Sequence, residues 1–299
     1  MSMTTKTRAA KPAPKAAASG TPPSGPSLAP EELLTGYRTM VTARFIDRKI
    51  LTLLKQGKVF FHIGVSGHEA AQVATAMAMR PGYDWAYPYY RDLAFSLRFG
   101  YTVEEIALEA LHRIGGPSSN GFAMPFHYGH RRWRIIAQSS PTGTQFLQAV
   151  GTAMGALKDG KDEVVYVSSG EGATSEGEFH EAINWAAREH YPVIFLIQNN
   201  RFAISVPVED QLAGKSVCAM TQGYAGLHRF RVDGCDFNAV YGAAAEAVAL
   251  ARRGEGPSVI EADVVRLLAH SSSDDQRKYR DAAELEADQR RDPIPRMEH

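Results

Sequence analysis

Residues 164–205 constrain the fold more than any other stretch of this chain. An apolar run over 164–168 ends at a glycine-rich turn, and a second apolar run, 192–197, ends in Gln198-Asn199-Asn200. Between the two runs, apolar side chains follow acidic residues at the spacing of a helix. This order predicts a βαβ unit, whose strands are parallel and whose crossover is right-handed.

Further alternation of strand and helix patterns extends this unit. Residues 229–233 and 257–264 are predicted strands, and a helix rich in alanine and valine lies between them, with Asn238 as its expected N-cap. A long amphipathic helix is predicted over 33–54. We therefore expect one α/β domain over residues 31–299, with a doubly wound, mostly parallel sheet and helices on both faces.

Polar residues follow both strands of the central unit. Glu171 lies between Gly170 and Gly172 after the first strand, and Asn200 follows the second. Ligands of such sheets bind beyond the carboxyl ends of the strands, so these side chains should meet. A carboxylate and an amide oxygen suit Mg²⁺, and the neighbouring helix N-terminus suits phosphate. The residues therefore predict a Mg²⁺-diphosphate site.

Two alternatives explain parts of the same pattern. A lone Gly-x-Gly also occurs in an ordinary strand-to-helix crossover that binds nothing. A dinucleotide site requires Gly-x-Gly-x-x-Gly, but Ser175 stands where the third glycine belongs. Glu171 would moreover repel a pyrophosphate unless a cation lay between the two.

Composition narrows the class of protein. The chain has 299 residues, 44% of them hydrophobic, and a formal net charge of zero, which lacks the basic bias of a nucleic-acid binder. No apolar run reaches the length of a membrane span. Cys218 and Cys235 are the only cysteines, so we expect no disulfide framework. Residues 1–30 are predicted to form a disordered tail; a mitochondrial transit peptide is the alternative.

The central stretch also resembles a known family. Gly170-Glu171-Gly172, followed beyond residues 173–198 by Asn199-Asn200, is similar to the thiamine diphosphate motif. The longer run 170–205 resembles the α subunits of 2-oxoacid dehydrogenases, the decarboxylating first components of the pyruvate and branched-chain complexes. The resemblance covers about residues 30–299, and Glu171, where most relatives have Asp, is similar to the branched-chain type.

The resemblance implies a role for each matching residue. Mg²⁺ would be held by Glu171, Asn200 and the backbone oxygen of Phe202. Residues 84–92 form a predicted aromatic loop, from which Arg91 would pair with the diphosphate through its rigid fork. The other cofactor contacts that the resemblance implies are Tyr90, Ser140, Thr142, Gly170, Gly172, Ala173, Gln198, Arg266 and His270.

Two further segments carry implied roles. His270 matches the active-site histidine of a loop that covers the cofactor, and Arg266 matches an arginine that supports it; the imidazole would stabilise developing charge or steer a lipoyl group. Leu268 and Ala269 depart from the family pattern in that loop. By residue type, the hydroxyl run before the predicted helix 144–158 is an N-cap. The resemblance adds a potassium site, found in some members, at Ser139, Pro141, Thr144 and Gln145.

The implied reaction is oxidative decarboxylation of a 2-oxoacid, such as 3-methyl-2-oxobutanoate, with acyl transfer to a lipoyl group of the acyltransferase component. The family takes the glutamate that acts on the aminopyrimidine ring from a β subunit, which implies an α2β2 heterotetramer and an inactive isolated chain. The implied location is the cytoplasm in a bacterium, or the mitochondrial matrix in a eukaryote.

Three alternatives to this function remain open from the sequence. The substrate could instead be pyruvate or acetoin, because part of the pocket lies on the β chain. The chain could also be a non-catalytic assembly subunit, against which the intact Glu171, Asn200 and His270 argue. An NAD-dependent dehydrogenase is disfavoured by the glycine spacing. Whether the serines at 271–273 are phosphorylated is not decided by the sequence.

Overall fold

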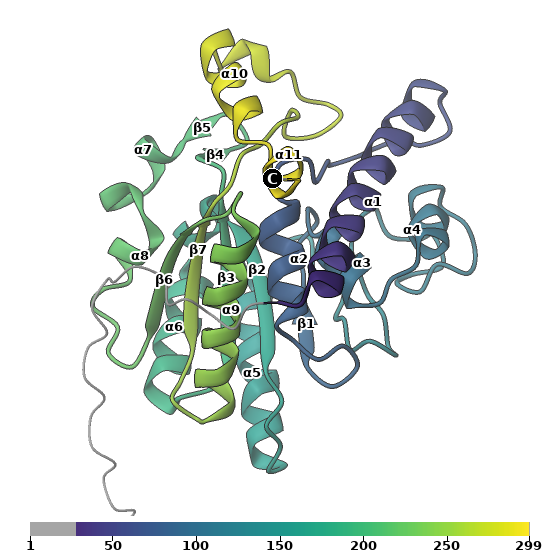
Figure 1. Ribbon diagram of the computed structural model, residues 1–299. Helices are drawn as coiled ribbons and strands as arrows, with labels where there is room; N and C mark the ends of the chain where they lie inside the picture. Colours follow the sequence, from purple (N-terminus) through teal and green to yellow (C-terminus); the bar gives the residue numbers. More distant parts are fainter. Residues whose placement is uncertain (1–27, 299) are drawn as a thin grey trace, which may run out of the picture.

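A five-stranded parallel sheet forms the centre of the computed structural model, which describes residues 28–298 (Figure 1). Its strand order is β1-β2-β3-β7-β6, and every neighbouring pair is parallel. The bounds are Trp85–Tyr87 for β1, Val165–Gly170 for β2, Val193–Asn199 for β3, His228–Asp233 for β6 and Ser258–Asp263 for β7. The predicted α/β class is confirmed. Of the predicted tail over 1–30, residues 1–27 lie outside the described residues, and Pro30 already begins helix α1.

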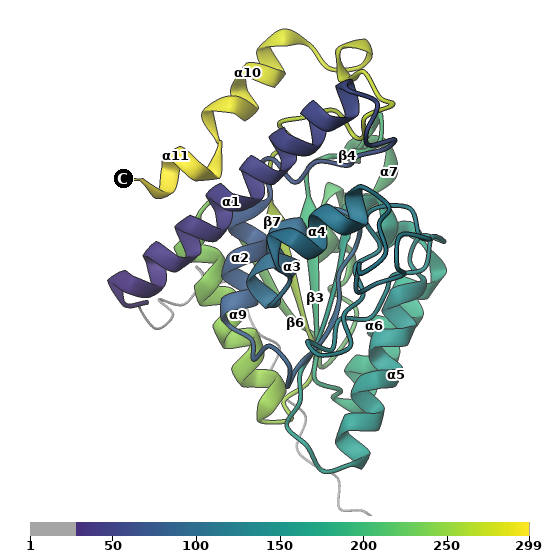
Figure 2. The ribbon, with the colours of Figure 1, turned by 90° about the vertical axis from the view of Figure 1, so that its right-hand side faces the viewer.

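Helices cover both faces of this sheet. One layer contains α1 (Pro30–Lys55), α2 (Glu69–Met77), α3 (Leu93–Phe99) and α9 (Phe237–Arg252); the other contains α5 (Thr144–Lys158) and α6 (Gly177–Glu189) (Figures 1 and 2). The side chains of strand β3 explain why both faces are covered. Ile194 and Leu196 belong to the core under the first layer, whereas Val193, Phe195 and Ile197 belong to the core under the second. A strand buried on both faces needs apolar side chains at consecutive positions.

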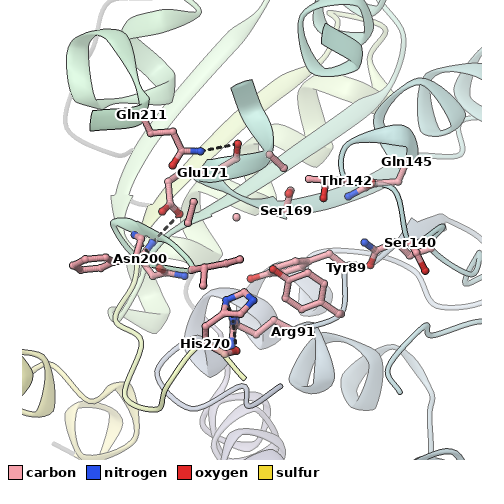
Figure 3. A pocket seen from close by; sticks show the side chains of 18 residues that line it. Tyr89, Arg91, Ser140, Thr142, Gln145, Ser169, Glu171, Asn200, Gln211 and His270 are labelled. Carbon is pink, nitrogen blue, oxygen red and sulfur yellow. Dashed lines mark hydrogen bonds between the residues drawn. The ribbon is translucent and has the colours of Figure 1, made fainter. Parts of the chain in front are cut away.

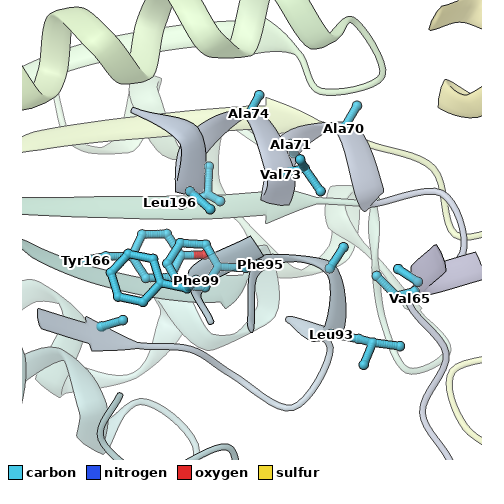
Figure 4. Close-up of a cluster of buried hydrophobic side chains, with 14 of the residues drawn as sticks. Val65, Ala70, Ala71, Val73, Ala74, Leu93, Phe95, Phe99, Tyr166 and Leu196 are labelled. Atoms are coloured by element: carbon cyan, nitrogen blue, oxygen red, sulfur yellow. The ribbon is translucent and has the colours of Figure 1, made fainter. Parts of the chain in front are cut away.

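Aromatic rings pack between the sheet and the first layer (Figure 4). The rings of Phe95 and Tyr166 stack with their centroids 3.9 Å apart, and Phe99 stacks on Phe95 at 5.0 Å. The Tyr166 hydroxyl donates a hydrogen bond to Asp92 at 2.9 Å. The core therefore reaches directly to the polar residues that precede helix α3.

Short elements connect this scaffold. The segment after β3 contains β4 (Phe202–Ala203), β5 (Val206–Pro207), α7 (Val208–Gln211), η2 (Ala213–Lys215) and α8 (Val217–Met220). Helix α4 (Val103–Ala110) follows α3 in the chain, and a 3₁₀ turn, η1 (Glu171–Ser175), follows β2. The C-terminal elements are η3 (Gln276–Lys278), α10 (Ala282–Arg290) and α11 (Pro293–Met297), of which α11 lies beside α1 (Figure 2). Within residues 28–298, no helix is both long and apolar enough to cross a bilayer.

Three local predictions were wrong. The aromatic loop at 84–92 contains strand β1, which pairs with β2 at the edge of the sheet. Helix α9 begins two residues earlier than expected, because the Asp236 carboxylate accepts from the Ala239 amide at 3.0 Å, so Asp236 and not Asn238 is the N-cap. Gly143, in the left-handed region, caps α5 without a side-chain hydrogen bond. The hydroxyl of Thr144 instead donates to Pro141 O at 3.0 Å.

Candidate active site

A cavity of ≈ 330 Å³ lies beyond the carboxyl ends of β2 and β3, where the sequence predicts a ligand (Figure 3). Most of the predicted contact residues line it: Tyr90, Arg91, Ser140, Thr142, Gln145, Gly170, Glu171, Gly172, Ala173, Asn200, Phe202 and His270. The remaining five predicted residues do not: Ser139, Pro141, Thr144, Gln198 and Arg266.

Glu171 and Asn200 form one side of the cavity, which we call the carboxylate wall. Glu171 is 1% exposed and begins η1. Its Oε2 accepts a hydrogen bond from the backbone N–H of Asn200 at 3.2 Å, while its Oε1 has no hydrogen-bond partner within the described residues. Burial raises the pKa of Glu171 to about 7. A carboxylate with one oxygen buried and unpaired is suited to accept a cation.

The turn that carries Glu171 packs against the segment that follows β3. A Cβ at Gly172 would lie 2.7 Å from the Cβ of Ala203, so this position excludes any side chain. The Gly172 carbonyl accepts from Gln211 Nε2 at 2.9 Å (Figure 3). Gly170, by contrast, has no atom within 4 Å of where its Cβ would be, which leaves room for a ligand above the strand end.

Tyr90, Arg91 and His270 form the opposite side, the arginine wall. The Arg91 side chain is held by Gly64 O, which accepts from Nη1 at 2.6 Å, and by His270 O, which accepts from Nη2 at 3.3 Å. Its Nε is buried and has no partner among residues 28–298. The guanidinium lies 5.6 Å from the centroid of the Tyr90 ring. This wall offers a cation with an unused donor.

His270 is placed by its own loop. Its amide donates to Asp274 Oδ2 at 2.8 Å, and the Tyr279 hydroxyl donates to the same oxygen at 2.5 Å. Arg266 Nη2 donates to that hydroxyl at 2.7 Å, so Arg266 supports the loop from outside the cavity. Burial, and then the charges of Arg91 and Arg266, lower the pKa of His270 to about 4. The imidazole is therefore neutral at pH 7.

The residues of the implied potassium site lie together, although only one of them reaches the cavity. The hydroxyls of Ser139 and Thr144 are hydrogen-bonded to each other, and the Pro141 carbonyl accepts from Thr144. Gln145 donates to Ser168 O at 3.2 Å, and its Oε1 has no partner within the described part of the chain. Near them, His127 Nε2 lies 3.1 Å from Ser140 Oγ.

Sequence reasoning missed six residues that line the cavity. Tyr89 is 2% exposed, and its hydroxyl lacks a partner within residues 28–298. Its position in the chain, directly before Tyr90 and Arg91, could have predicted it as a lining residue. Four of the others also lie within two residues of a predicted contact: Gln138, Ser169, Ala203 and Ile204. Nothing local marks the last, Gln211, which reaches the cavity only through the fold.

The two walls fit a metal-diphosphate group. Within the part of the chain that the structure describes, the carboxylate wall has an unpaired acceptor in Glu171, and the arginine wall has an unpaired donor in Arg91. Space for the ligand exists beside Gly170. Within residues 28–298 there is no group of three or more His, Cys, Asp and Glu side chains that could hold a metal, so a cation here would also need ligands from the bound molecule.

Fold and cavity together define a class: an α/β protein with a polar site at the carboxyl ends of parallel strands. Transketolase from Campylobacter jejuni has a similar fold, with a TM-score of 0.58 over 79% of this chain and 38% of that one, at 19% identity. The family model for the dehydrogenase E1 component matches residues 37–299. The chain belongs to the dehydrogenase E1 component family.

Curated relatives agree with this assignment. The chain is 41% identical over 267 residues to the 2-oxoisovalerate dehydrogenase subunit alpha of Bacillus subtilis, covering 89% of this chain and 81% of the relative. It is 39% identical to the 3-methyl-2-oxobutanoate dehydrogenase subunit alpha of Mycobacterium tuberculosis, covering 89% and 70%. The mitochondrial mouse 2-oxoisovalerate dehydrogenase subunit alpha is 35% identical, covering 92% and 62%.

Proposed function

We propose that this chain is the α subunit of a 2-oxoacid dehydrogenase that decarboxylates a branched-chain 2-oxoacid such as 3-methyl-2-oxobutanoate. The observation that carries the proposal is that Glu171 and Arg91 line one cavity and that each has a buried polar atom without a hydrogen-bond partner among the described residues. The relatives at 39–41% identity carry 2-oxoisovalerate and 3-methyl-2-oxobutanoate in their names. Family membership favours this function over an NAD-dependent dehydrogenase.

The carboxylate wall would hold Mg²⁺ through Glu171, Asn200 and the backbone oxygen of Phe202. The arginine wall would hold the diphosphate through Arg91 and Tyr90. Thiamine diphosphate, when bound, supplies the carbanion chemistry of decarboxylation. The task of the chain is then to neutralise the diphosphate from both walls and to hold the cofactor in one orientation.

His270 has a separate task in this proposal. Because its imidazole is neutral, one ring nitrogen can donate a hydrogen bond and the other can accept one. Nδ1 lies 3.5 Å from Arg91 Nη2, which sets the side of the ring that faces the arginine. In this proposal the ring would hydrogen-bond the reacting acyl group and guide its transfer to a lipoyl acceptor.

Partners complete the proposal. We infer a β subunit that supplies the missing glutamate, in an α2β2 heterotetramer, and a lipoyl domain of the acyltransferase as acceptor. Potassium at Ser139, Pro141, Thr144 and Gln145 would stabilise the segment that carries Ser140 and Thr142. The proposed location is the cytoplasm for a bacterial source and the mitochondrial matrix for a eukaryotic one.

The test is calorimetric titration of thiamine diphosphate with Mg²⁺ into the chain alone and into the chain co-produced with its β subunit. A decarboxylation assay on 3-methyl-2-oxobutanoate and on pyruvate follows. We expect turnover only in the pair, with the branched acid preferred. Preference for pyruvate would contradict the substrate, and absence of binding in both forms would instead support the non-catalytic assembly subunit.

A further inference from the structure

A group of buried polar side chains lies behind the arginine wall. Asp92 is 0% exposed, and its carboxylate accepts from three neutral donors: Ser168 Oγ, Tyr166 OH at 2.9 Å and Gln198 Nε2 at 2.6 Å. A carboxylate buried among neutral donors is costly unless its hydrogen bonds are complete. The position of this group, directly behind the turn that carries Arg91, suggests a structural role for it.

Gln198 is the centre of this group. It is 0% exposed, and its Oε1 accepts from Gln72 Nε2 and from His68 Nδ1, both at 2.9 Å. Because the Asp92 carboxylate can only accept, the amide nitrogen of Gln198 must face it, and the orientation of the amide follows. We call Gln72, Asp92, Ser168 and Gln198 the polar frame.

The polar frame holds the backbone of the turn that carries Arg91. The Tyr89 amide donates to Ser168 Oγ at 3.1 Å, and Gln72 Nε2 donates to Arg91 O at 3.1 Å. Gln72 Oε1 in turn accepts from the Ala94 amide at 3.0 Å, at the start of α3. The turn is thereby attached at both ends to side chains of β2 and α2.

The four residues of the polar frame do not line the cavity. Neither Asp92 nor Gln198 lines the cavity, although the resemblance implied a direct cofactor contact for Gln198. Gln198 instead pairs in register with Gly170, the last residue before Glu171. One residue therefore links the two walls: its backbone pairs with the strand end of the carboxylate wall, and its side chain bonds Asp92 in the turn of the arginine wall.

We propose that Asp92 and Gln198 are positioning residues, which hold the turn of residues 89–92 against β2 and β3 and so set the place from which Arg91 binds the cofactor diphosphate. This inference rests on the proposed function. Its consequence is that a defect in the polar frame should weaken recognition of the diphosphate more than recognition of the rest of the cofactor.

An exchange of the two side chains tests the role. Asp92→Asn alone brings an amide N–H against Gln198 Nε2, so two donors face each other. Gln198→Glu alone brings two carboxylates together. The double variant restores every hydrogen bond, because the amide at position 92 donates to the carboxylate at position 198, which still accepts from His68 and Gln72. Charge and volume of the pair are unchanged.

The measurement is calorimetric affinity for thiamine diphosphate and thiamine monophosphate, each with Mg²⁺, on the full chain with its β subunit, together with the melting temperature. Each single variant should lose at least about tenfold in diphosphate affinity, since small misplacements of binding groups carry large costs. The monophosphate affinity should change less. The double variant should return to within about threefold of the wild type.

A milder variant covers the case in which the single variants do not fold. Ser168→Ala removes one donor to Asp92 and the acceptor of the Tyr89 amide, and it should weaken diphosphate binding by about threefold. Ser258→Ala is its control, because Ser258 is also fully buried on a strand but has no hydrogen-bond partner within residues 28–298.

Three results would overturn the inference. The first is wild-type diphosphate affinity in folded single variants or in Ser168→Ala. The second is a double variant that folds but stays as weak as the single variants. The third is an equal loss for both ligands, which would indicate a general structural role. A wild-type pair that binds no thiamine diphosphate would overturn the proposed function itself, whatever the variants do.

Discussion

The two walls of the cavity are built in different ways. The carboxylate wall follows β2 and β3, which are neighbours in the sheet and are joined by a single crossover helix. The arginine wall joins segments far apart in the chain, since Arg91 and His270 are separated by 179 positions. Segments that follow one another in the sequence therefore form the first wall, whereas the second depends on long-range contacts such as that between Arg91 and Gly64 O.

This difference predicts how each wall tolerates change. A ligand on a strand end keeps its place as long as the sheet forms, so its substitution should remove its own chemistry and nothing else. A residue of the arginine wall depends on partners from several segments, so its substitution should also release those partners. The predictions below run from the largest expected effect to the smallest.

The largest effect is expected for Glu171→Gln. The change keeps the shape of the side chain but removes the charge that a cation requires, so Mg²⁺-dependent affinity for thiamine diphosphate should fall by about 100-fold or more, roughly 2.7 kcal/mol. Calorimetry on the chain with its β subunit measures it. Glu181→Gln, which removes an exposed charge from α6, is the control and should bind normally. An unchanged affinity in Glu171→Gln would contradict the assignment of this wall.

Arg91→Lys should have the next largest effect. Lysine keeps the charge but replaces a fork of donors by one point charge, and the contacts to Gly64 O and His270 O cannot both be kept. We expect about tenfold weaker cofactor binding, roughly 1.4 kcal/mol. Arg48→Lys, at an exposed position of α1, should change nothing. Equal affinities for Arg91→Lys and the wild type would show that charge alone is sufficient in this wall.

His270→Ala separates binding from transfer. Because His270 lies beside Arg91 and not on the carboxylate wall, cofactor affinity should stay within about tenfold of the wild type, whereas acyl transfer to a lipoyl acceptor should be lost. Comparison of transfer with decarboxylation, measured through an artificial electron acceptor, distinguishes the two steps. Full transfer in the variant would remove His270 from the proposed chemistry.

The same contrast explains what could be predicted from the sequence. Glu171 and Asn200 were found from residue types alone, because parallel strands bring their carboxyl ends to one edge. Arg91 and His270 were named only through a family resemblance, since no local pattern places them together. Gln211 was missed for the same reason, whereas Tyr89 was missed although it directly precedes Tyr90 and Arg91 in the chain. Strand β1 was missed because three residues of an edge strand, Trp85–Tyr87, carry no distinct periodicity.

The position of Gln198 shows the limit of the resemblance. A motif assigns a position in the chain, but the direction of a side chain depends on the partners that the fold supplies. Asp92, His68 and Gln72 surround Gln198 and satisfy its amide, so the side chain remains behind the cavity. A neutral side chain at this position can make its hydrogen bonds to other residues of the chain, and sequence similarity does not reveal this.

The smallest effect concerns the ionisation of His270. Its pKa of about 4 in the folded chain lies below the ordinary value of 6.5, so between these two values the unfolded chain binds a proton that the folded chain does not. The contribution of this group to stability is therefore complete above pH 6.5 and is lost as the pH falls toward 4. Arg266→Gln should raise the pKa of His270, because it removes one of the two arginine charges that lower it, although burial remains the larger cause.

Titration of the imidazole resonance by nuclear magnetic resonance, assigned with His270→Ala, measures the pKa of His270 in the wild type and in Arg266→Gln, each without cofactor. A wild-type resonance that titrates near 6.5 would mean that the arginine wall opens in solution, and the arrangement of Arg91, Arg266 and His270 would then depend on the bound cofactor.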